Sequence, residues 1–472
     1  MSKHISSELT SIEHFHQESP EGIHIQNLSQ FFTDTFKCEP DFFTLVPGRV
    51  NLIGEHVDYC GYSVCPMAIK NSIILAVKTF PSDVIKIVNI DPNYGHSYRN
   101  NADQLRIEVK PGKAPAWYCY VLCGIKGVLE ALPSGQKPVG LSLAVTGNVP
   151  QASGLSSSSA LVCAAALATV YANKLDISRK SLANLCAKAE QYIGTQGGGM
   201  DQAIALLATT GSAKHIYFNP LRSEDVQLPD GCVFVIANSL SELNKAETHH
   251  YNTRVAECCL ANQVMAKFRN VVGIDVNRFS ELQEKLGVGL SEMIELAKQA
   301  LHEKPYMKQE ICTVLGLTES ELNTKFVPQN IWQTNEFKLR DRALHVLQEA
   351  QRVDIFCGIC REQMPAEKAL KQLGKLMSKS HESLKTLYEC SHPELDRLVA
   401  LSDGIALGCR LTGAGWGGCV VALTTKDTVE SYIKMLKERF YETNPTIKGK
   451  DLNMFVFATE PSGGAQIIVK HI

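Results

Sequence analysis

The segment 147–160, GNVPQASGLSSSSA, is rich in hydroxyl groups and small residues and runs directly into an apolar stretch at 160–172. Pro150 and Gly154 interrupt regular structure in the segment, and the apolar stretch predicts a buried helix. A helix that opens from such a loop offers unpaired N–H groups and the positive end of its dipole, which favour an anion such as phosphate. A flexible turn is the ordinary alternative for a Gly/Ser-rich segment, so phosphate binding needs chemical partners elsewhere in the chain.

Two carboxylates later in the chain are candidates for such partners. Glu190 falls in the last turn of a helix predicted after Ser178, where a negative charge is unfavourable unless a cation offsets it. Glu190 is therefore a candidate metal ligand, with a solvated surface carboxylate as the alternative. Asp201 follows the consecutive glycines 197–199, which suit a tight turn or the close approach of a ligand. Such an Asp can act as a general base or orient a substrate, although ordinary turn chemistry also places Asp beside glycine.

The segment 46–59, VPGRVNLIGEHVDY, interleaves Arg49, Glu55, His56 and Asp58 with apolar residues. The apolar positions predict a short buried strand, and charged side chains on a buried segment need partners. A polar sugar supplies many partners, because carboxylates accept from hydroxyl groups, His donates or accepts, and Arg stabilises an anion. A solvated charged face is the alternative interpretation.

A third segment, 410–423, is rich in glycine. Gly413, Gly415 and Gly418 fit the formal pattern G-x-G-x-x-G, but a β-branched run follows them where a helix would be required. That order excludes a dinucleotide-binding motif, and the chain has no GxxxxGK[ST] sequence either. We expect this segment to bring backbone close to a phosphate or to support the active site.

The composition is that of a folded globular protein, since 44% of the 472 residues are hydrophobic and 20% are charged. The net charge of −2 gives no global electrostatic basis for binding nucleic acid. The apolar run at 160–172 is too short to span a bilayer, and the polar residues 1–20 predict no signal peptide. The 16 scattered cysteines fit a reduced cytoplasmic protein, and a lone CxxC pair, Cys357 and Cys360, is a poor candidate for a zinc site.

A chain of this length is expected to divide into domains. We place the boundary near residue 225, which gives domains of 1–225 and 226–472. Trp117 comes just before a predicted helix and is most simply a core residue, with contact to a nucleobase as the alternative. Strands are predicted at 50–53, 72–77, 84–88 and 232–237, and helices at 124–131, 160–172, 182–193 and 251–269, with a mostly helical region continuing to about residue 405.

Together, these segments resemble the motifs of the GHMP kinases, and PGRVNLIGEHVDY resembles the signature of the galactokinase branch. PQASGLSSSSA is similar to the ATP loop of the family and LTGAGWGGC to its closing glycine loop, while GGGMDQ and YNTR add to the match. The resemblance extends from about residue 40 to the end of the sequence. It implies two α+β domains with the active site in the cleft between them, and ATP-dependent phosphorylation of a sugar at its anomeric C1 hydroxyl.

Within this branch, EHVDYCGYSVCPMA is most similar to the N-acetylgalactosamine kinases, whose pattern resembles DYCGYSVLPMA. Cys65 replaces the usual Leu, and residues 151–153 depart from the Gly-rich form of many relatives. N-acetylgalactosamine is therefore the expected substrate, with a galactokinase acting mainly on galactose as the alternative. A non-catalytic regulator that senses sugar and ATP is a second alternative, although the residues expected for catalysis are all present.

The resemblance also implies roles for individual residues. Arg49 and Asp201 would form the catalytic pair at the anomeric hydroxyl, and Ser157 and Glu190 would hold Mg²⁺. Trp117 would lie near the adenine of ATP. We expect a cytoplasmic monomer that binds the sugar, ATP and Mg²⁺, and neither nucleic acid nor membrane. The sugar would be held by Glu55, His56, Asp58, Tyr251 and backbone near Gly198, the phosphates by Gly154, Ser156, Ser157, Ser158 and Ser159, and the border of the nucleotide by Asn244 and Lys245.

Overall fold

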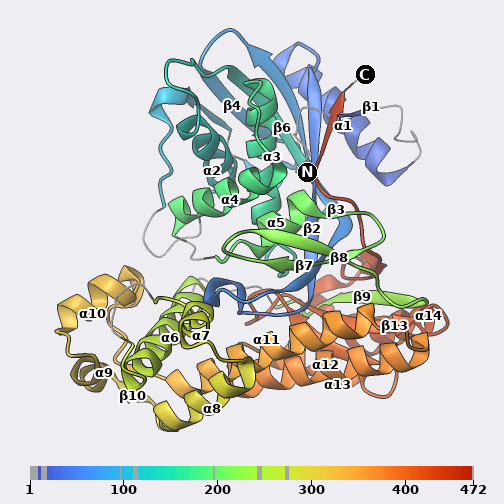
Figure 1. Ribbon diagram of the computed structural model, residues 1–472. Coiled ribbons are helices and arrows are strands. Elements are labelled where there is room, and N and C mark those ends of the chain that lie inside the picture. The colour runs from blue at the N-terminus through green and yellow to red at the C-terminus, as the bar shows by residue number, and fades with distance from the viewer. Residues whose placement is uncertain are drawn as a thin grey trace.

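The computed structural model has two lobes, the upper one built on a seven-stranded sheet and the lower one on a four-stranded sheet and a layer of helices (Figure 1). Both lobes mix helices with strands, which confirms the predicted α+β class. The structure describes residues 9–11, 19–95, 97–109, 115–194, 197–241, 247–271 and 276–469.

Two long strands, β2 (Phe42–Ile53) and β3 (Cys65–Phe80), form the centre of the upper sheet. Every residue of β2 is buried, because both faces of the sheet are covered. The pairing of β2 with β3 shifts register between Pro47 and Arg49, and such a bulge redirects the side chains that follow it. The strand order is β1 (Leu9–Ser11), β15 (Gln466–Val469), β2, β3, β6 (Gly140–Gly147), β4 (Val84–Asn89) and β5 (Tyr98–Asn101).

Helices cover both faces of this sheet. α1 (Pro20–Phe36) packs on one face through Ile25, Leu28 and Phe32. α3 (Ser157–Ala172) packs on the other face, and nearly all of its residues are buried, as expected for a helix that is apolar on every side. The helix predicted at 160–172 is therefore confirmed, and its buried position fixes the serine loop before it. The same side of the sheet carries α2 (Trp117–Glu130), α4 (Arg179–Ala189) and α5 (Met200–Leu207).

The lower lobe begins with β9 (Cys232–Asn238), as predicted for 232–237. β9 pairs with β13 (Cys419–Thr425) and β14 (Val456–Thr459), and β12 (Gly408–Thr412) pairs with the other edge of β13. The third motif therefore turns between two strands, which confirms that a strand follows its glycines.

The remaining elements extend the lower lobe and link it to the upper one. The predicted helix at 251–269 corresponds to α6 (Glu247–Phe268), which begins four residues earlier and ends one residue earlier, and long helices run along the base of the molecule (Figure 1). The other helices are α7 (Phe279–Leu286), α8 (Leu290–Ala300), α9 (Lys308–Leu315), α10 (Glu319–Phe326), α11 (Leu339–Arg361), α12 (Ala366–Thr386), α13 (Pro393–Ser402) and α14 (Val429–Leu436), and the short strand pairs are β7 (Ala213–Tyr217) with β8 (Arg222–Val226) and β10 (Tyr306–Met307) with β11 (Glu336–Phe337).

The predicted boundary near residue 225 falls in β8, just before the first strand of the lower sheet. The chain crosses between the lobes again near its C-terminal end, because β15 pairs with β2 in the upper sheet. The division into 1–225 and 226–472 stays a prediction, and the upper lobe also includes residues 466–469.

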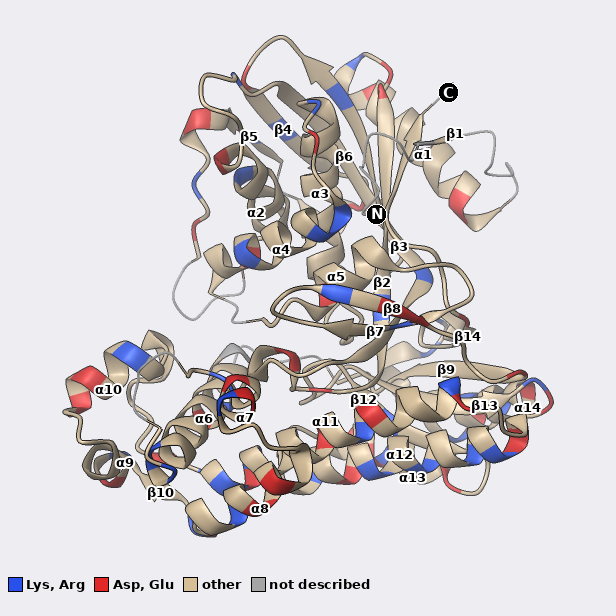
Figure 2. Ribbon diagram, viewed as in Figure 1, with Lys and Arg blue, Asp and Glu red and all other residues tan. Residues whose placement is uncertain are grey.

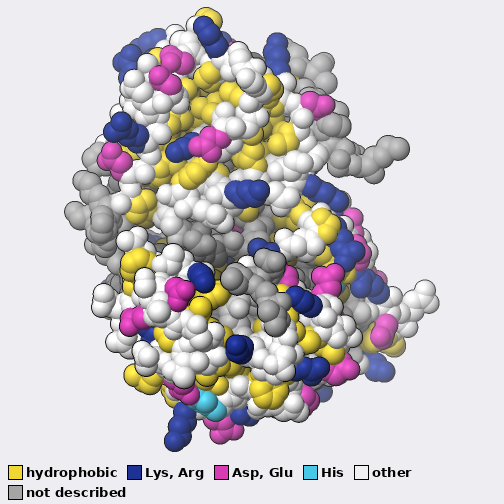
Figure 3. Space-filling model, turned by 60° about the vertical axis from the view of Figure 1, so that its left-hand side comes forward, with side chains coloured by type: hydrophobic (Ala, Val, Ile, Leu, Met, Phe, Trp, Pro, Cys, Tyr) yellow, Lys and Arg dark blue, Asp and Glu magenta, His cyan; other side chains and the backbone are white. Residues whose placement is uncertain are grey.

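Charged side chains of both signs are interspersed over both lobes (Figure 2). The same mixture of signs is seen on the face that shows the narrowing between the lobes (Figure 3). Within the part of the chain that the structure describes, no helix is both long and apolar enough to cross a membrane. The same described residues contain no group of three or more His, Cys, Asp or Glu that could hold a metal ion. Cys357 and Cys360 both lie on α11, and all 16 cysteines are free thiols.

Candidate active site

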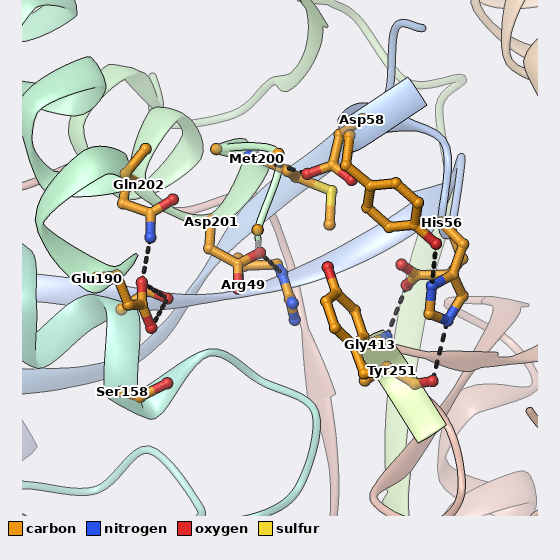
Figure 4. A pocket seen from close by; sticks show the side chains of 18 of the residues that line it. Arg49, His56, Asp58, Ser158, Glu190, Met200, Asp201, Gln202, Tyr251 and Gly413 are labelled. Atoms are coloured by element: carbon orange, nitrogen blue, oxygen red, sulfur yellow. Dashed lines mark hydrogen bonds and ion pairs between the residues drawn. The ribbon is translucent and has the colours of Figure 1, made fainter. Parts of the chain in front are cut away.

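A cavity of about 270 Å³ lies where the two lobes meet, and all three motifs contribute to its wall (Figure 4). β2 and the turn after it bring the first motif, α3 brings the serine loop, and the turn between β12 and β13 brings the third motif. This position agrees with the expected cleft between domains. The predicted site residues in the wall are Arg49, Glu55, His56, Asp58, Ser158, Ser159, Glu190, Gly198, Asp201 and Tyr251.

An ion pair between Arg49 and Asp201 occupies the middle of the wall, where Arg49 Nε donates to Asp201 Oδ1 at 2.8 Å. Asp201 lies in the first turn of α5, where the helix dipole favours a negative charge. Its side chain is 26% exposed and that of Arg49 only 6%, so the carboxylate is the member of the pair that a ligand can reach. Burial acts to lower the pKa of Arg49, but the charges of Asp201 and Glu55 raise it above its usual value.

Gly154 holds the serine loop against the third motif. It has φ of +72°, and a Cβ atom at this position would lie 2.5 Å from the carbonyl oxygen of Thr412, so the close approach requires glycine. The carbonyl oxygen of Gly154 accepts from Arg49 Nη1. The serine loop and the ion pair are thus fixed to each other.

The serines of the loop divide their contacts between the two carboxylates. Ser156 precedes α3 in the left-handed conformation, and its hydroxyl donates to Asp201 Oδ2. Ser158 and Ser159 lie in the cavity wall, whereas Ser157 is not among the lining residues. The first turn of α3, whose N–H groups have no partner within the helix, therefore borders the cavity.

Glu190 begins a short 3₁₀ helix, Glu190–Ile193, and is 7% exposed. Its carboxylate accepts from Ser159 Oγ at 2.8 Å and from the side-chain amide of Gln202. Burial, followed by the negative charge of Asp201, raises the pKa of Glu190 to about 7. A buried carboxylate with neutral hydrogen-bond partners suits a cation, and Mg²⁺ prefers oxygen ligands. Glu190 and a neighbouring serine hydroxyl therefore fit the predicted Mg²⁺ site.

Glu55 fastens the first motif to the third. Its Oε1 accepts from the N–H of Gly413 at 2.6 Å and from Thr412 Oγ1 at 3.3 Å, and Arg410 Nη2 lies 3.6 Å away. These contacts engage one carboxylate oxygen and leave Oε2 as the oxygen that can accept from a ligand.

Asp58 lies under the turn that leads into α5. Its Oδ2 accepts from the N–H of Met200 at 3.3 Å. Burial, followed by the charge of Asp201, raises the pKa of Asp58 to about 6. A Cβ atom on Gly198 would overlap the Asp58 carboxylate and the N–H of Tyr59, so this turn too depends on a glycine.

The ring of His56 also borders the cavity, but both of its nitrogens have partners within the protein. Nδ1 lies 3.0 Å from Tyr59 Oη, and Nε2 lies 3.0 Å from the carbonyl oxygen of Ala414. Burial, followed by the charge of His345, lowers the pKa of His56 to about 3, so the ring is neutral at neutral pH.

Trp117, Asn244 and Lys245 were predicted to lie at the nucleotide. Trp117 is not among the lining residues; its indole N–H donates to the carbonyl oxygen of Tyr94 at 3.2 Å, and the two rings pack edge to face. Its place near the adenine stays a prediction. Asn244 and Lys245 fall outside the residues that the structure describes.

Sequence reasoning missed Gln202 and Tyr59, which hold Glu190 and His56 respectively. Both residues belong to the motifs described above, and each is next to a residue with a predicted role. Only that position in the sequence could have indicated that they contribute to the site. The hydroxyl of Ser156 donates to Asp201 Oδ2, and the predicted contact of Ser156 with the phosphates stays a prediction.

Three family descriptions match separate parts of the chain. The galactokinase galactose-binding signature matches residues 30–79, the GHMP kinases N terminal domain matches 120–209, and the GHMP kinases C terminal description matches 362–442. These ranges contain the first motif, the serine loop and the third motif, in that order.

Whole-chain similarity agrees with these matches. A galactokinase of Dictyostelium discoideum is 39% identical, over 94% of this chain and 93% of its own length. A galactokinase of Saccharomyces cerevisiae is 32% identical, over 92% of each chain. The crystal structure of Lactococcus lactis galactokinase complexed with galactose has a TM-score of 0.71 at 25% identity, covering 94% of this chain and 99% of its own. The mevalonate kinase of Methanococcus jannaschii, at 18% identity and a TM-score of 0.53 over 90% of this chain and 99% of its own, shares the fold.

Proposed function

Because this chain belongs to the galactokinase branch of the GHMP kinases, which are ATP-dependent kinases, we propose that it phosphorylates galactose at the anomeric C1 hydroxyl. The Dictyostelium discoideum and Saccharomyces cerevisiae relatives and the Lactococcus lactis structure are all named galactokinases. Their names favour the galactose alternative over the N-acetylgalactosamine specificity that the sequence pattern led us to expect.

The observation that carries this proposal is the ion pair between Arg49 and Asp201, in a cavity that also contains Glu190. Phosphoryl transfer depends more on positioning and charge neutralisation than on covalent chemistry by the protein. Asp201 would accept the proton of the C1 hydroxyl or orient that hydroxyl for attack. Arg49 would stabilise the negative charge on the phosphoryl group during transfer.

The ATP phosphates would lie at the start of α3, where free N–H groups and the helix dipole favour anions. When bound, Mg²⁺ would supply positive charge to these phosphates. Glu190 would hold it together with a hydroxyl of the serine loop. Ser157 is the serine expected from the sequence, and Ser158 is the one in the cavity wall.

The sugar would be held by Glu55 Oε2, the Asp58 carboxylate, Tyr251 and the backbone near Gly198, which share the cavity with Asp201. N-acetylgalactosamine remains the second candidate substrate, because the segment at 58–68, DYCGYSVCPMA, resembles its kinases. Parallel assays of ADP release with galactose and N-acetylgalactosamine distinguish the two. We expect a higher kcat/KM for galactose, and a clear preference for N-acetylgalactosamine would contradict the proposal. A non-catalytic sensor would release no ADP with either sugar.

The pH dependence of sugar use should reflect Asp58. Its carboxylate accepts from sugar hydroxyls only when ionised, and its pKa is raised to about 6. We therefore expect kcat/KM for galactose, at saturating ATP and Mg²⁺, to fall as the pH decreases through about 6. Asp58→Asn should have a lower kcat/KM without this acidic limb. An unchanged acidic limb in Asp58→Asn would assign it to another group.

A methyl group at Gly198 should impair sugar binding, since its Cβ atom would displace the Asp58 carboxylate. We expect Gly198→Ala to raise the galactose KM about tenfold, as overpacking costs on the order of 1–3 kcal/mol. The matched control is Gly197→Ala, because a Cβ atom there meets nothing within 4 Å. Equal effects of the two variants on the galactose KM would rule out this contact as the cause.

A further inference from the structure

Two cysteines to which the sequence gave no role lie in contact outside the active site. Cys65 begins β3, at the position where the kinases that this segment resembles have Leu, and Cys357 is the first cysteine of the CxxC pair on α11. Both are free thiols, fully buried in one hydrophobic cluster, and neither lines the cavity. Their side chains are hydrogen-bonded to each other. Segments far apart in the sequence thus bring two thiols together.

A backbone bridge places a histidine beside Cys65. Val64 pairs with Ile216 of β7 in an antiparallel bridge, in which each residue donates its N–H to the other, at 3.0 and 2.9 Å. In antiparallel pairing the residue after Val64 lies across from the residue before Ile216. Cys65 therefore lies across from His215, which is only 2% exposed. The two thiols have a buried imidazole ring as their neighbour.

The hydrogen bonds of His215 leave one ring nitrogen for Cys357. Arg361 lies one helical turn after Cys357, on the same face of α11, and its Nη2 is 3.1 Å from His215 Nδ1. Because a guanidinium can only donate, Nδ1 carries no proton and the ring proton is on Nε2. Nε2 is buried with no nitrogen or oxygen partner among the described residues, and Cys357 Sγ lies within reach of a hydrogen bond from the ring. A negatively charged sulfur would accept that bond.

These surroundings favour a thiolate at Cys357 and a thiol at Cys65. Against the effect of burial, the pKa of Cys357 is lowered to about 6, first by the hydrogen bond from Cys65. The His215 ring and the charge of Arg361 act in the same direction. The hydrogen bond, followed by burial, raises the pKa of Cys65 well above its usual value. A nucleophilic thiolate thus has a protonated thiol beside it, as in a pair that oxidation joins.

We propose that Cys357 and Cys65 form a modification site for peroxides, at which oxidation links α11 to β3 through a disulfide. The Cys357 thiolate attacks one peroxide oxygen, the O–O bond breaks and hydroxide leaves, so that Cys357 becomes a sulfenic acid. The sulfur of Cys65 then attacks this sulfur, and the thiol proton leaves with the sulfenic oxygen and its hydrogen as water. The two sulfurs lose two electrons in all, and the peroxide takes them up.

Burial and helix geometry restrict both the oxidant and the partner. Because Cys65 and Cys357 are 0% exposed, the oxidant must be small, such as hydrogen peroxide, and glutathione disulfide is too large to reach them. Cys360 lies three residues after Cys357 on α11. Residues at this spacing have Cβ atoms about 5–6 Å apart, whereas a disulfide needs about 3.5–4.5 Å. Cys65 is therefore the partner that can close a disulfide while α11 stays helical.

The disulfide would reach the kinase site through the turn between β2 and β3. Cys65 pairs with Ile53 at the end of β2, and the N–H of the next residue, Gly54, donates to Glu349 Oε1 on α11 at 2.9 Å. A disulfide holds its sulfurs about 2 Å apart, closer than two thiols in contact, so its formation draws α11 and this turn together. The effect on activity rests on the proposed kinase function, whereas the chemistry of the thiols does not.

Mass spectrometry of peptides from the unaltered protein, after a titration with hydrogen peroxide, tests the chemistry. We expect a disulfide between Cys65 and Cys357 that dithiothreitol reverses. In Cys65→Ser the disulfide cannot close, so the sulfenic acid of Cys357 should accumulate and react with dimedone. A disulfide between Cys357 and Cys360, no oxidation of Cys357, or an equal yield from glutathione disulfide would overturn the proposal.

Cys163 on α3 and Cys186 on α4 are the matched control pair. Both are buried, and their thiols are hydrogen-bonded to each other. Burial and this hydrogen bond raise the pKa of Cys163, and the charges of Glu190 and Asp201 add to the effect. We therefore expect this pair to stay reduced at peroxide doses that oxidise Cys357. Oxidation of both pairs at the same dose would show that contact between buried thiols suffices, and would refute the site.

Two variants test the groups that favour the thiolate. His215→Phe keeps an aromatic ring but removes the N–H, so the disulfide should form about tenfold more slowly. Arg361→Gln is the milder change, because the side chain of Arg361 is 49% exposed, and it should slow the reaction about threefold. Unchanged rates of disulfide formation in both variants would overturn the proposal.

Assays of ADP release measure the effect on the kinase. Peroxide-treated protein should have a kcat/KM for galactose lower by at least about threefold, since small displacements of positioning groups reduce turnover, and dithiothreitol should restore it. Cys357→Ser, treated in the same way, should keep its activity. An unchanged kcat/KM in fully disulfide-linked protein would refute the effect on the turn. The proposed function fails separately, if the reduced, unaltered chain phosphorylates neither sugar.

Discussion

An Asp201→Asn variant is expected to lose about 10²–10⁴-fold in kcat while it still binds ATP, because general-base catalysis contributes rate enhancements of this size. The amide keeps the shape of the side chain and can still accept from Ser156, but it cannot take the sugar proton. Arg49 also loses the charge that pairs with it at 2.8 Å. Steady-state turnover with galactose, combined with calorimetric titration of ATP, measures the two properties separately.

A suitable control is Asp225→Asn, which removes a carboxylate that lies 2.7 Å from Lys214 and outside the cavity wall. It should leave both turnover and ATP affinity unchanged. Near-normal turnover of Asp201→Asn would show that Asp201 neither accepts the proton nor orients the hydroxyl. A loss of ATP binding in parallel with turnover would instead indicate damage to the serine loop, which contacts Asp201 through Ser156.

Glu190→Gln should raise the Mg²⁺ concentration needed for half-maximal activity by at least about tenfold, since even indirect partners of a metal contribute 10–100-fold to its affinity. The same change removes a buried negative charge whose hydrogen-bond partners, Ser159 and Gln202, are neutral. We therefore expect a higher midpoint of thermal unfolding than in the unaltered protein when Mg²⁺ is absent. Activity measured across a Mg²⁺ titration and unfolding measured without Mg²⁺ give the two values.

Glu224→Gln is the control for Glu190→Gln, because Glu224 pairs with Arg361 on the surface. An unchanged Mg²⁺ requirement in Glu190→Gln would remove Glu190 from the metal site. Ser157→Ala and Ser158→Ala then identify the hydroxyl ligand. The position of Ser158 in the cavity wall leads us to expect the larger increase in Mg²⁺ requirement from Ser158→Ala.

Sequence patterns predicted the presence of helices and strands better than the residues at which these elements begin and end. α3 was recognised because its apolar run is uninterrupted, and the strand at 50–53 because apolar residues cluster there. The full length of β2, Phe42–Ile53, was missed because burial on both faces removes the alternation that marks a strand. The return of β15 to the upper sheet had no local signal, because strand pairing between distant segments depends on the whole fold.

In the candidate site, too, the sequence predicted features that depend on neighbouring residues better than contacts between distant segments. Arg49 and Asp201 were each singled out by local chemistry, but only resemblance to a family predicted that they pair. The contacts of Glu55 with Gly413 and of His56 with Ala414 join side-chain and backbone atoms of residues that are 358 positions apart in the sequence. No spacing along the chain encodes such contacts, so the structure was needed to identify them.

Because β15 pairs with β2, the upper sheet cannot be completed during synthesis until the C-terminal strand has been made. Residues 466–469 complete the sheet beside Leu45, Thr44, Phe43 and Phe42, in the strand that also contains Arg49. A nascent chain that has emerged only as far as β14 still presents β2 as an open edge, available for pairing with another chain. Truncation before residue 466 should therefore yield an aggregation-prone product, even though every residue that lines the cavity is present.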